Sequence, residues 1–180
     1  MTIVASAAIM AAMRGLLGLV DREEAKAAIP RTELAGLIAQ LRVALIAGVD
    51  REFLECPEVA QLEVTAAQFS ILKMVLKGSA RSACDLCKCL DYDRGAMSRM
   101  IDRLEAKHLI RRVPLAHTRR TMALEVTPAG KAAFPKMEGC LDRVVSRLLR
   151  GVTKTQVREA EAVLKRMLVN AADAGERAKA

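Results

Sequence analysis

Residues 82–127 read SACDLCKCLDYDRGAMSRMIDRLEAKHLIRRVPLAHTRRTMALEVT, and this stretch decides the fold. Ser82, followed by Asp85 three residues later, has the spacing of a capping box and predicts the start of a short helix. Asp93 is the predicted N-cap of a second helix, Arg94 to Lys107. The apolar residues of this second helix recur at helical spacing and form one stripe to be buried: Met97, Met100, Ile101 and Leu104. Two helices joined by a short turn are typical of a helix-turn-helix.

The opposite face of the second helix is polar and basic, and it carries Arg94, Gly95, Ser98, Arg99, Asp102 and Arg103. Two short β-prone runs follow at 109–113 and 122–126, and the segment between them holds His117, Arg119 and Arg120. A hairpin with a basic tip directly after such a helix is a wing. The pattern therefore predicts that the helix reads a major groove while an arginine of the wing enters a neighbouring minor groove.

Charge and composition favour duplex DNA as the partner. Any single arginine on a helix face usually lies in solvent, but eight lysines or arginines lie between Arg94 and Arg120, on one helix and one hairpin. The net charge of +8 and the pI near 9.6 favour a polyanionic partner. One tyrosine, three phenylalanines and no tryptophan are too few for the stacking platforms of single-strand binders.

Residues 65–130 resemble the MarR/SlyA-type bacterial transcriptional regulators, which are winged-helix homodimers. The resemblance is carried by 64–72, by 93–105, by the Arg119-Arg120 pair and by LEVTPAG at 124–130. It implies a mainly α fold with a small two-stranded β-wing, in which a winged helix-turn-helix is joined to a helical dimerisation layer. It also implies an operator-binding regulator, usually a repressor, and a pocket for a small aromatic or phenolic effector, commonly an aromatic acid. No enzymatic activity and no cofactor are expected.

The chain departs from the family pattern at three places. The family usually has Asp two residues before the minor-groove arginine, where this chain has Thr118 before Arg120. It usually has Gly after the recognition helix, where this chain has His108, which predicts either a left-handed residue or a differently made turn. Three cysteines crowd the first helix of the motif.

The flanking segments predict a dimer. Residues 1–60 are expected to form N-terminal helices of the dimerisation layer, 61–127 the DNA-binding lobe, and 128–180 the C-terminal dimerisation helices. A long apolar stripe precedes Cys56-Pro57, and two further striped helices follow the wing. Together they expose more apolar surface than one small domain can cover, so we expect a homodimer on a roughly palindromic operator.

Eight residues are predicted to contact DNA. Arg94, Ser98 and Arg99 are expected at base edges, while Arg103 and Arg112 are expected at phosphates. The full predicted set is Arg94, Gly95, Ser98, Arg99, Arg103, Arg112, Arg119 and Arg120.

The cysteines of the first motif helix suggest an alternative function. Cys84 and Cys87 lie three residues apart and share a helix face, whereas Cys89 points elsewhere, so one helix cannot gather all three on a metal ion. We expect no metal site. Cys84 lies near the helix N-terminus, where a thiol pKa can be lowered, and a thiol-based redox-sensing regulator using Cys84 and Cys87 is the alternative hypothesis.

Other function classes are less favoured. The apolar residues 1–20 lack a basic leading region and are interrupted by Arg14, which favours an extra helix on the dimer layer over a signal peptide or a membrane span. Cysteines without an export signal point to a reducing cytoplasm. An enzyme is disfavoured because neither His108 nor His117 has a catalytic partner at a telling spacing. A pure protein-interaction module would leave the basic wing without a purpose.

Overall fold

A computed structural model describes residues 31–115 and 118–177, without the side chains of 115, 118–121 and 174–177. The chain divides into two units, residues 1–41 and residues 42–180, and the described part of the first is the start of helix α2. The predicted helix at 1–20 lies outside the described residues. The elements are α2 (Arg31–Glu55), α3 (Pro57–Ala60), α4 (Ala66–Leu76), α5 (Ala83–Leu90), α6 (Arg94–Ala106), β1 (Ile110–Leu115), β2 (Thr118–Val126), α7 (Pro128–Leu148) and α8 (Lys154–Arg177).

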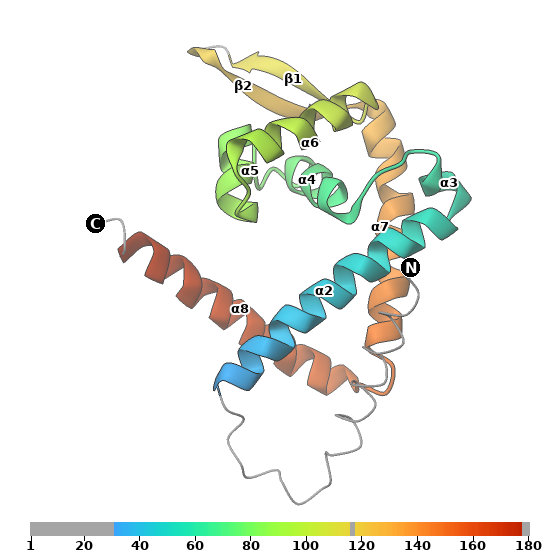
Figure 1. The fold of residues 1–180 in the computed structure, drawn as a ribbon, viewed down its shortest axis with the longest axis vertical. Helices are drawn as coiled ribbons and strands as arrows, with labels where there is room; N and C mark the ends of the chain where they lie inside the picture. Colours follow the sequence, from blue (N-terminus) through green and yellow to red (C-terminus); the bar gives the residue numbers. More distant parts are fainter. Residues whose placement is uncertain (1–30, 116–117, 178–180) are drawn as a thin grey trace, which may run out of the picture. The chain divides into compact units, whose positions relative to one another are not determined.

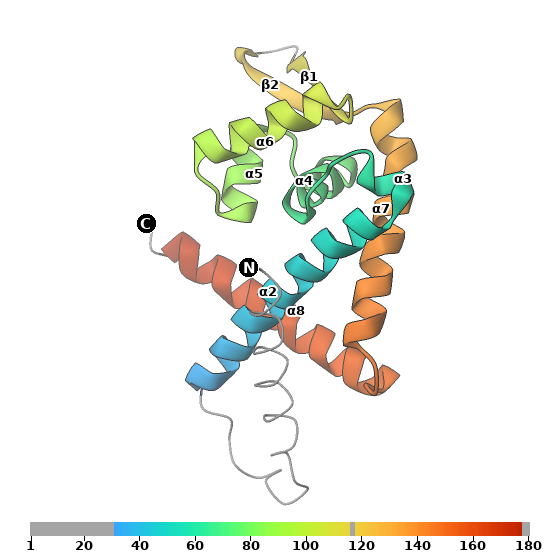
Figure 2. The same ribbon diagram turned by 45° about the vertical axis from the view of Figure 1, so that its right-hand side comes forward.

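The second unit contains the predicted winged helix-turn-helix, in which α4, α5 and α6 are followed by the β1–β2 hairpin (Figure 1). The hairpin lies beside α6 in both views (Figures 1 and 2). Its strands pair antiparallel, from Ile110 with Val126 to Leu115 with Thr118, and the register shifts between Pro114 and Leu115. The mainly α fold with a two-stranded wing is confirmed, and both strands extend further than the β-prone runs in the sequence.

Local capping chemistry defines the ends of these helices. Thr65 and Gln68 form a reciprocal capping box at the start of α4. Gly78 has a φ of 71° and follows the last turn, where its N–H donates to the Val75 carbonyl at 3.1 Å. Such a left-handed residue satisfies helix carbonyls that would otherwise lack a partner.

The core of the second unit joins α2 and α7 to the helix-turn-helix. Phe69 of α4 contacts Phe53 edge-on, with ring centroids 5.7 Å apart, and stacks on Phe134 at 5.4 Å. Gly48 allows α2 to approach α7, because a Cβ there would lie 2.9 Å from Cγ1 of Val144. Below α6, the fully buried side chains of Met97, Ile101 and Leu104 extend this core, as the apolar stripe predicted, while Met100 is half-buried.

Helix α2 is long and apolar enough to cross a membrane when judged by length and composition alone. However, Val49, Glu52 and Phe53, in its last two turns, are buried within the protein. Several apolar side chains of α2 remain exposed: Leu34, Leu37, Ile38, Leu41, Val43, Ile46 and Leu54. The described side chains of α8 are nearly all exposed as well, including the apolar Val163, Leu164, Leu168 and Val169.

Candidate nucleic-acid interface

Side chains cap the first turns of both α5 and α6. Ser82 accepts from the Asp85 N–H at 3.2 Å, and Asp85 accepts from the Ser82 N–H at 3.0 Å, which confirms the predicted capping box. The Ser82 hydroxyl, followed by the Arg81 N–H, lowers the pKa of Asp85. Asp91 adopts a left-handed conformation with a φ of 53°, and Asp93 then caps α6 by accepting from the Ala96 N–H at 2.8 Å.

The polar face of α6 is exposed along its length, as predicted. Arg94, Gly95, Ser98, Arg99 and Arg103 all lie in solvent, on the side of the helix opposite the buried stripe. A Cβ on Gly95 would lie 3.2 Å from Oδ1 of Asp93 and 3.4 Å from Nη1 of Arg99. The Arg99 guanidinium therefore lies close to the N-terminal turn of α6, and a larger residue at position 95 would displace it.

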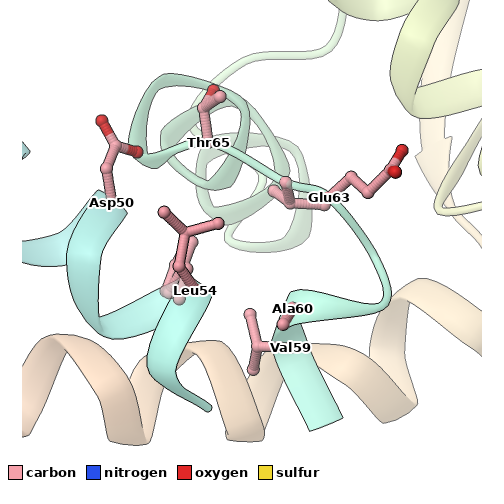
Figure 3. A pocket seen from close by; sticks show the side chains of 8 residues that line it. Asp50, Leu54, Val59, Ala60, Glu63 and Thr65 are labelled. Atoms are coloured by element: carbon pink, nitrogen blue, oxygen red, sulfur yellow. The ribbon is translucent and has the colours of Figure 1, made fainter. Parts of the chain in front are cut away.

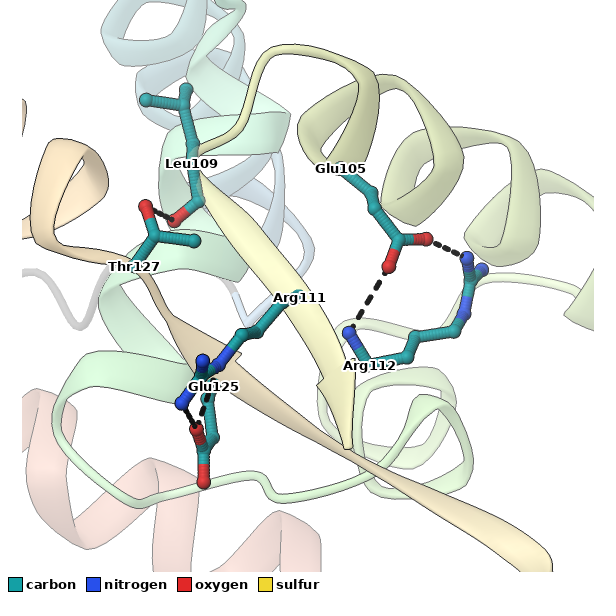
Figure 4. A network of polar contacts seen from close by, with 6 residues as sticks. All are labelled: Glu105, Leu109, Arg111, Arg112, Glu125 and Thr127. Carbon is teal, nitrogen blue, oxygen red and sulfur yellow. Dashed lines mark hydrogen bonds and ion pairs between the residues drawn. The ribbon is translucent and has the colours of Figure 1, made fainter. Parts of the chain in front are cut away.

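Arg112 joins the wing to the recognition helix (Figure 4). Its backbone N–H donates to Oε1 of Glu105 at 3.1 Å, and its guanidinium forms an ion pair with the same carboxylate. The guanidinium also forms an ion pair with Asp102 of α6. Its side chain is only 30% exposed, and the Asp102 carboxylate, followed by Glu105, raises the pKa of Arg112. The sequence predicts that Arg112 contacts phosphate, and in the structure most of its hydrogen-bonding capacity is directed at α6.

The neighbouring Arg111 differs from Arg112 in its environment. It pairs with Glu125 across the two strands, with Nη2 to Oε2 at 2.6 Å, and its side chain is 64% exposed (Figure 4). Surface pairs of this kind add little to stability. Thr118, Arg119 and Arg120 begin β2, but their side chains lie outside the described residues, as does His117.

The end of α6 is made without glycine. His108 has a φ of 55°, its N–H donates to the Glu105 carbonyl at 2.8 Å, and the Leu109 N–H donates to the Leu104 carbonyl at 3.0 Å. These two bonds form a Schellman motif with histidine in the left-handed position. Of the two alternatives that the sequence left open, the left-handed residue is therefore correct. Thr127 fixes the following segment by donating its hydroxyl to the Leu109 carbonyl at 3.3 Å (Figure 4).

Lys107 ties the end of α6 to the segment before α4, which the sequence did not predict. Its Nζ donates to the carbonyls of Leu62 at 2.8 Å and Glu63 at 2.6 Å. Glu63 is itself left-handed, with a φ of 48°. The partners lie more than forty residues apart in sequence, so no local pattern could have indicated the contact.

A hollow of about 230 Å³ lies between the end of α2, α3 and the start of α4 (Figure 3). Its lining is mainly apolar, with Phe53, Leu54 and Val59 among its residues. The carboxylates of Asp50 and Glu63 lie on opposite sides of the hollow (Figure 3). Asp50 also accepts from the Ala66 N–H at 2.6 Å, so it supports the first turn of α4.

The cysteines of α5 do not converge. Cys84 and Cys89 are exposed and Cys87 is half-buried, and all three are free thiols. Within 31–115 and 118–177, no three cysteine, histidine or carboxylate side chains come together in a way that could hold a metal ion.

Comparison with known proteins gives consistent results. A model of the MarR family matches residues 62–121. The multiple antibiotic resistance protein MarR of Salmonella typhimurium is 32% identical over 114 residues, covering 61% of this chain and 77% of that protein. The HTH-type transcriptional repressor MdtR of Bacillus subtilis is 27% identical over 117 residues, covering 65% and 74% of the two chains. The crystal structure of wild-type MarR from E. coli in its apo form matches with a TM-score of 0.60 and 28% identity, over 79% of this chain and 99% of that one.

Proposed function

Because the chain belongs to the MarR family of transcriptional regulators, we propose that it is a homodimeric, DNA-binding repressor that a small-molecule effector releases from its operator. The observation that carries the proposal is the exposed basic face of α6, which is backed by a buried apolar stripe and braced against the wing by Arg112. Members of this family are regulators and not enzymes. A DNA-binding repressor would work in the cytoplasm.

The exposed residues of α6 support specific roles on DNA. Arg94, Ser98 and Arg99 are proposed to read base edges. Gly95 has no side chain, so the backbone of α6 can lie close to the DNA at that position. Arg103 is proposed to contact phosphate. The wing arginines, Arg119 and Arg120, are proposed to enter the minor groove, where negative potential favours a guanidinium.

Arg112 is proposed to have two roles of unequal weight. Its ion pairs with Asp102 and Glu105 hold the wing at a fixed angle to α6. Only the minor exposed part of its side chain remains for a phosphate contact. Its main contribution to binding would then be to arrange the helix and the wing before DNA arrives, which lowers the ordering cost on association.

Exposed apolar residues support the homodimer. Those of α2 and α8 are spaced at helical intervals, and a second copy of the chain would remove them from water. We retain 1–60 and 128–180 as the segments of the dimerisation layer and 61–127 as the DNA-binding lobe. Two recognition helices related by a two-fold axis would bind a roughly palindromic operator.

The hollow beside α3 supports a refinement of the effector class. Its apolar lining suits a small aromatic ring, but the carboxylates of Asp50 and Glu63 flank it. The Asp50 carboxylate disfavours a ligand carboxylate in the hollow, whereas the Glu63 carboxylate is exposed and pairs with Lys107 at 3.8 Å. A neutral phenolic effector is therefore favoured over the aromatic acids common in the family.

Selection from a random duplex library tests the main proposal. We expect an enriched site with two related halves about one DNA turn apart, together with a dimeric mass in light scattering. A protein that retains no duplex above the background of a charge-matched basic control would contradict DNA binding. A monomeric mass at the concentration that binds DNA would contradict the dimer.

A redox-sensing regulator of the same fold is the second candidate, because Cys84 is exposed near the start of α5 and Cys87 lies one turn further on. In that case peroxide should release operator DNA reversibly, and Cys84→Ser should resist the release. Cys89→Ser is the matched control, since Cys89 is also exposed but lies on a different side of α5. Unchanged DNA binding by the oxidised wild-type protein would rule out this candidate.

A further inference from the structure

A second group of sulfur atoms lies at the crossing of α2 and α7, away from the cysteines of α5. The two helices run in opposing directions (Figures 1 and 2), and their register is set by ion pairs from Glu52 of α2 to Arg143 and Arg147 of α7. Cys56 follows Glu52 by one turn, and its N–H donates to the Glu52 carbonyl at 3.0 Å. Cys140 precedes Arg143 by one turn, so this register places Cys140 opposite the junction of α2 and α3, where Cys56 is the N-cap of α3.

The surroundings of the two thiols differ in a useful way. Cys140 is 0% exposed, whereas Cys56 is half-buried and open to small solutes. Burial, followed by the neighbouring Cys56 thiol, raises the pKa of Cys140. Arg143 offsets part of this effect, because its Nη2 lies 3.2 Å from Sγ of Cys140 and donates to it.

We propose that Cys56 and Cys140 are an oxidisable pair that forms an intrachain disulfide in the presence of a hydroperoxide. A free, buried cysteine is usually only a small apolar side chain in the core. Three features distinguish this pair: a second thiol beside the first, a cation hydrogen-bonded to one sulfur, and unequal access to solvent. We therefore assign Cys56, the more accessible thiol, as the cysteine that reacts with peroxide, and Cys140 as the resolving cysteine that then forms the disulfide with it.

The proposed reaction has two steps. In the first, the Cys56 thiolate attacks a peroxide oxygen, the O–O bond breaks, and Cys56 becomes a sulfenic acid with release of water or an alcohol. In the second, the Cys140 sulfur attacks the sulfenic sulfur, the S–O bond breaks, and the hydroxyl leaves as water with the Cys140 proton. The two thiols lose two electrons in total, and the peroxide accepts them. Arg143 assists the second step by stabilising the Cys140 thiolate.

The test uses the full-length chain with Cys84, Cys87 and Cys89 all changed to Ser, so that only Cys56 and Cys140 remain of the five cysteines. After hydrogen peroxide, we expect both thiols to be lost in a free-thiol assay and both to return with dithiothreitol. Trypsin should then release peptide 52–73 linked to peptide 137–143, lighter by two hydrogens than their sum. The same variant with Cys56→Ser should keep its remaining, buried thiol free.

Three outcomes would overturn the proposal: two thiols that stay free, thiols oxidised separately to sulfinic acid, or a linkage between two chains on a non-reducing gel. Circular dichroism of each variant before oxidation checks that it is folded, and the linked peptide is sought in the wild-type protein as well. Absence of that peptide from a folded wild-type protein also overturns the proposal.

Arg143 and Arg147 provide a matched pair for the second step. Both pair with Glu52, but only Arg143 donates to a cysteine sulfur. We expect Arg143→Gln to accumulate a sulfenic acid at Cys56 that dimedone traps several-fold more than in the parent. Arg147→Gln should behave as the parent does. Equal trapping in the two variants would overturn the role given to Arg143.

Discussion

Gly130, in the first turn of α7, packs directly against the carbonyl oxygen of Leu109 at the start of the wing. A Cβ at position 130 would lie 2.1 Å from that oxygen and 2.8 Å from Cγ1 of Val126. The Gly130 N–H also donates to the Thr127 hydroxyl at 3.0 Å, so neither the helix cap nor the strand can move aside alone. Glycine is thus required here by close approach and not by a special backbone conformation.

Replacing Gly130 with Ala should therefore destabilise the fold. We expect the free energy of unfolding in urea to fall by about 1–3 kcal/mol, as for other overpacked sites. Gly139→Ala in the same helix is the control, because its Cβ would meet only Nη1 of Arg143, at 3.9 Å. The control should be neutral or more stable by about 0.5–1 kcal/mol, since Ala favours a helix. Equal effects of the two changes would contradict the packing argument.

Arg112→Ala should weaken DNA binding without changing which sequence is preferred. The change removes the brace between the wing and α6 and leaves Asp102 and Glu105 without their cation. We expect a loss of stability of about 1–2 kcal/mol and a uniform loss of affinity across a library of sites. Arg111→Ala is the control, with a stability change of about 0–1 kcal/mol, because its pair with Glu125 is exposed. A shift in base preference at one position would mean that Arg112 reads sequence directly.

The ion pairs of Glu52 should make stability depend on pH. Hydrogen bonds from Arg143 and then Arg147 lower the pKa of Glu52 below its ordinary value of 4.5. A lowered folded-state pKa contributes stability that is present above pH 4.5 and is lost as the pH falls through the folded value. Glu52→Gln should therefore be less stable than wild type at pH 7, by about 1–2 kcal/mol given that both arginines are half-exposed. The difference should shrink as the pH falls below 4.5.

Urea unfolding of both proteins between pH 7 and pH 3 measures this difference. Asp85 also has a lowered pKa, but it is present in both proteins and its contribution cancels. Glu138→Gln serves as the control, because Glu138 forms a partly exposed pair with Lys73, at 3.6 Å, and no other ion pair within the described residues. A gap between wild type and Glu52→Gln that stays constant with pH would show that the carboxylate charge is not what stabilises this contact.

Arg99 and Arg103 should differ in what they contribute to DNA binding. Arg99→Ala is expected to cost about 1–3 kcal/mol and to relax the preference at one base pair. Arg103→Ala should weaken binding to all sequences alike and reduce the salt dependence by about one unit of slope. Affinities across a site library, repeated at several salt concentrations, separate the two effects. If both variants lose affinity uniformly, the assignment of direct base readout to Arg99 is wrong.

The helix-turn-helix and its caps could be predicted from sequence because their signals are local. Each helix start is indicated by residues within a few positions of it. These are Thr65 with Gln68 for α4, Ser82 with Asp85 for α5, and Asp93 alone for α6. The apolar stripe of α6 identifies both its buried and its exposed face, so the basic surface follows directly. The two β-prone runs that follow α6 in the sequence then predict the wing.

Tertiary structure alone decided which charged groups act on one another. Glu52 pairs with Arg143, 91 residues away in the sequence, and Lys107 donates to the Glu63 carbonyl, 44 residues away. No periodic pattern links such positions, because the contacts depend on the angle and register at which whole helices pack. For the same reason the sequence did not indicate the ion pairs of Arg112, which was predicted only as a phosphate contact. In the folded chain two carboxylates of the preceding helix hold its guanidinium, and only the path of the turn at His108 brings them within reach.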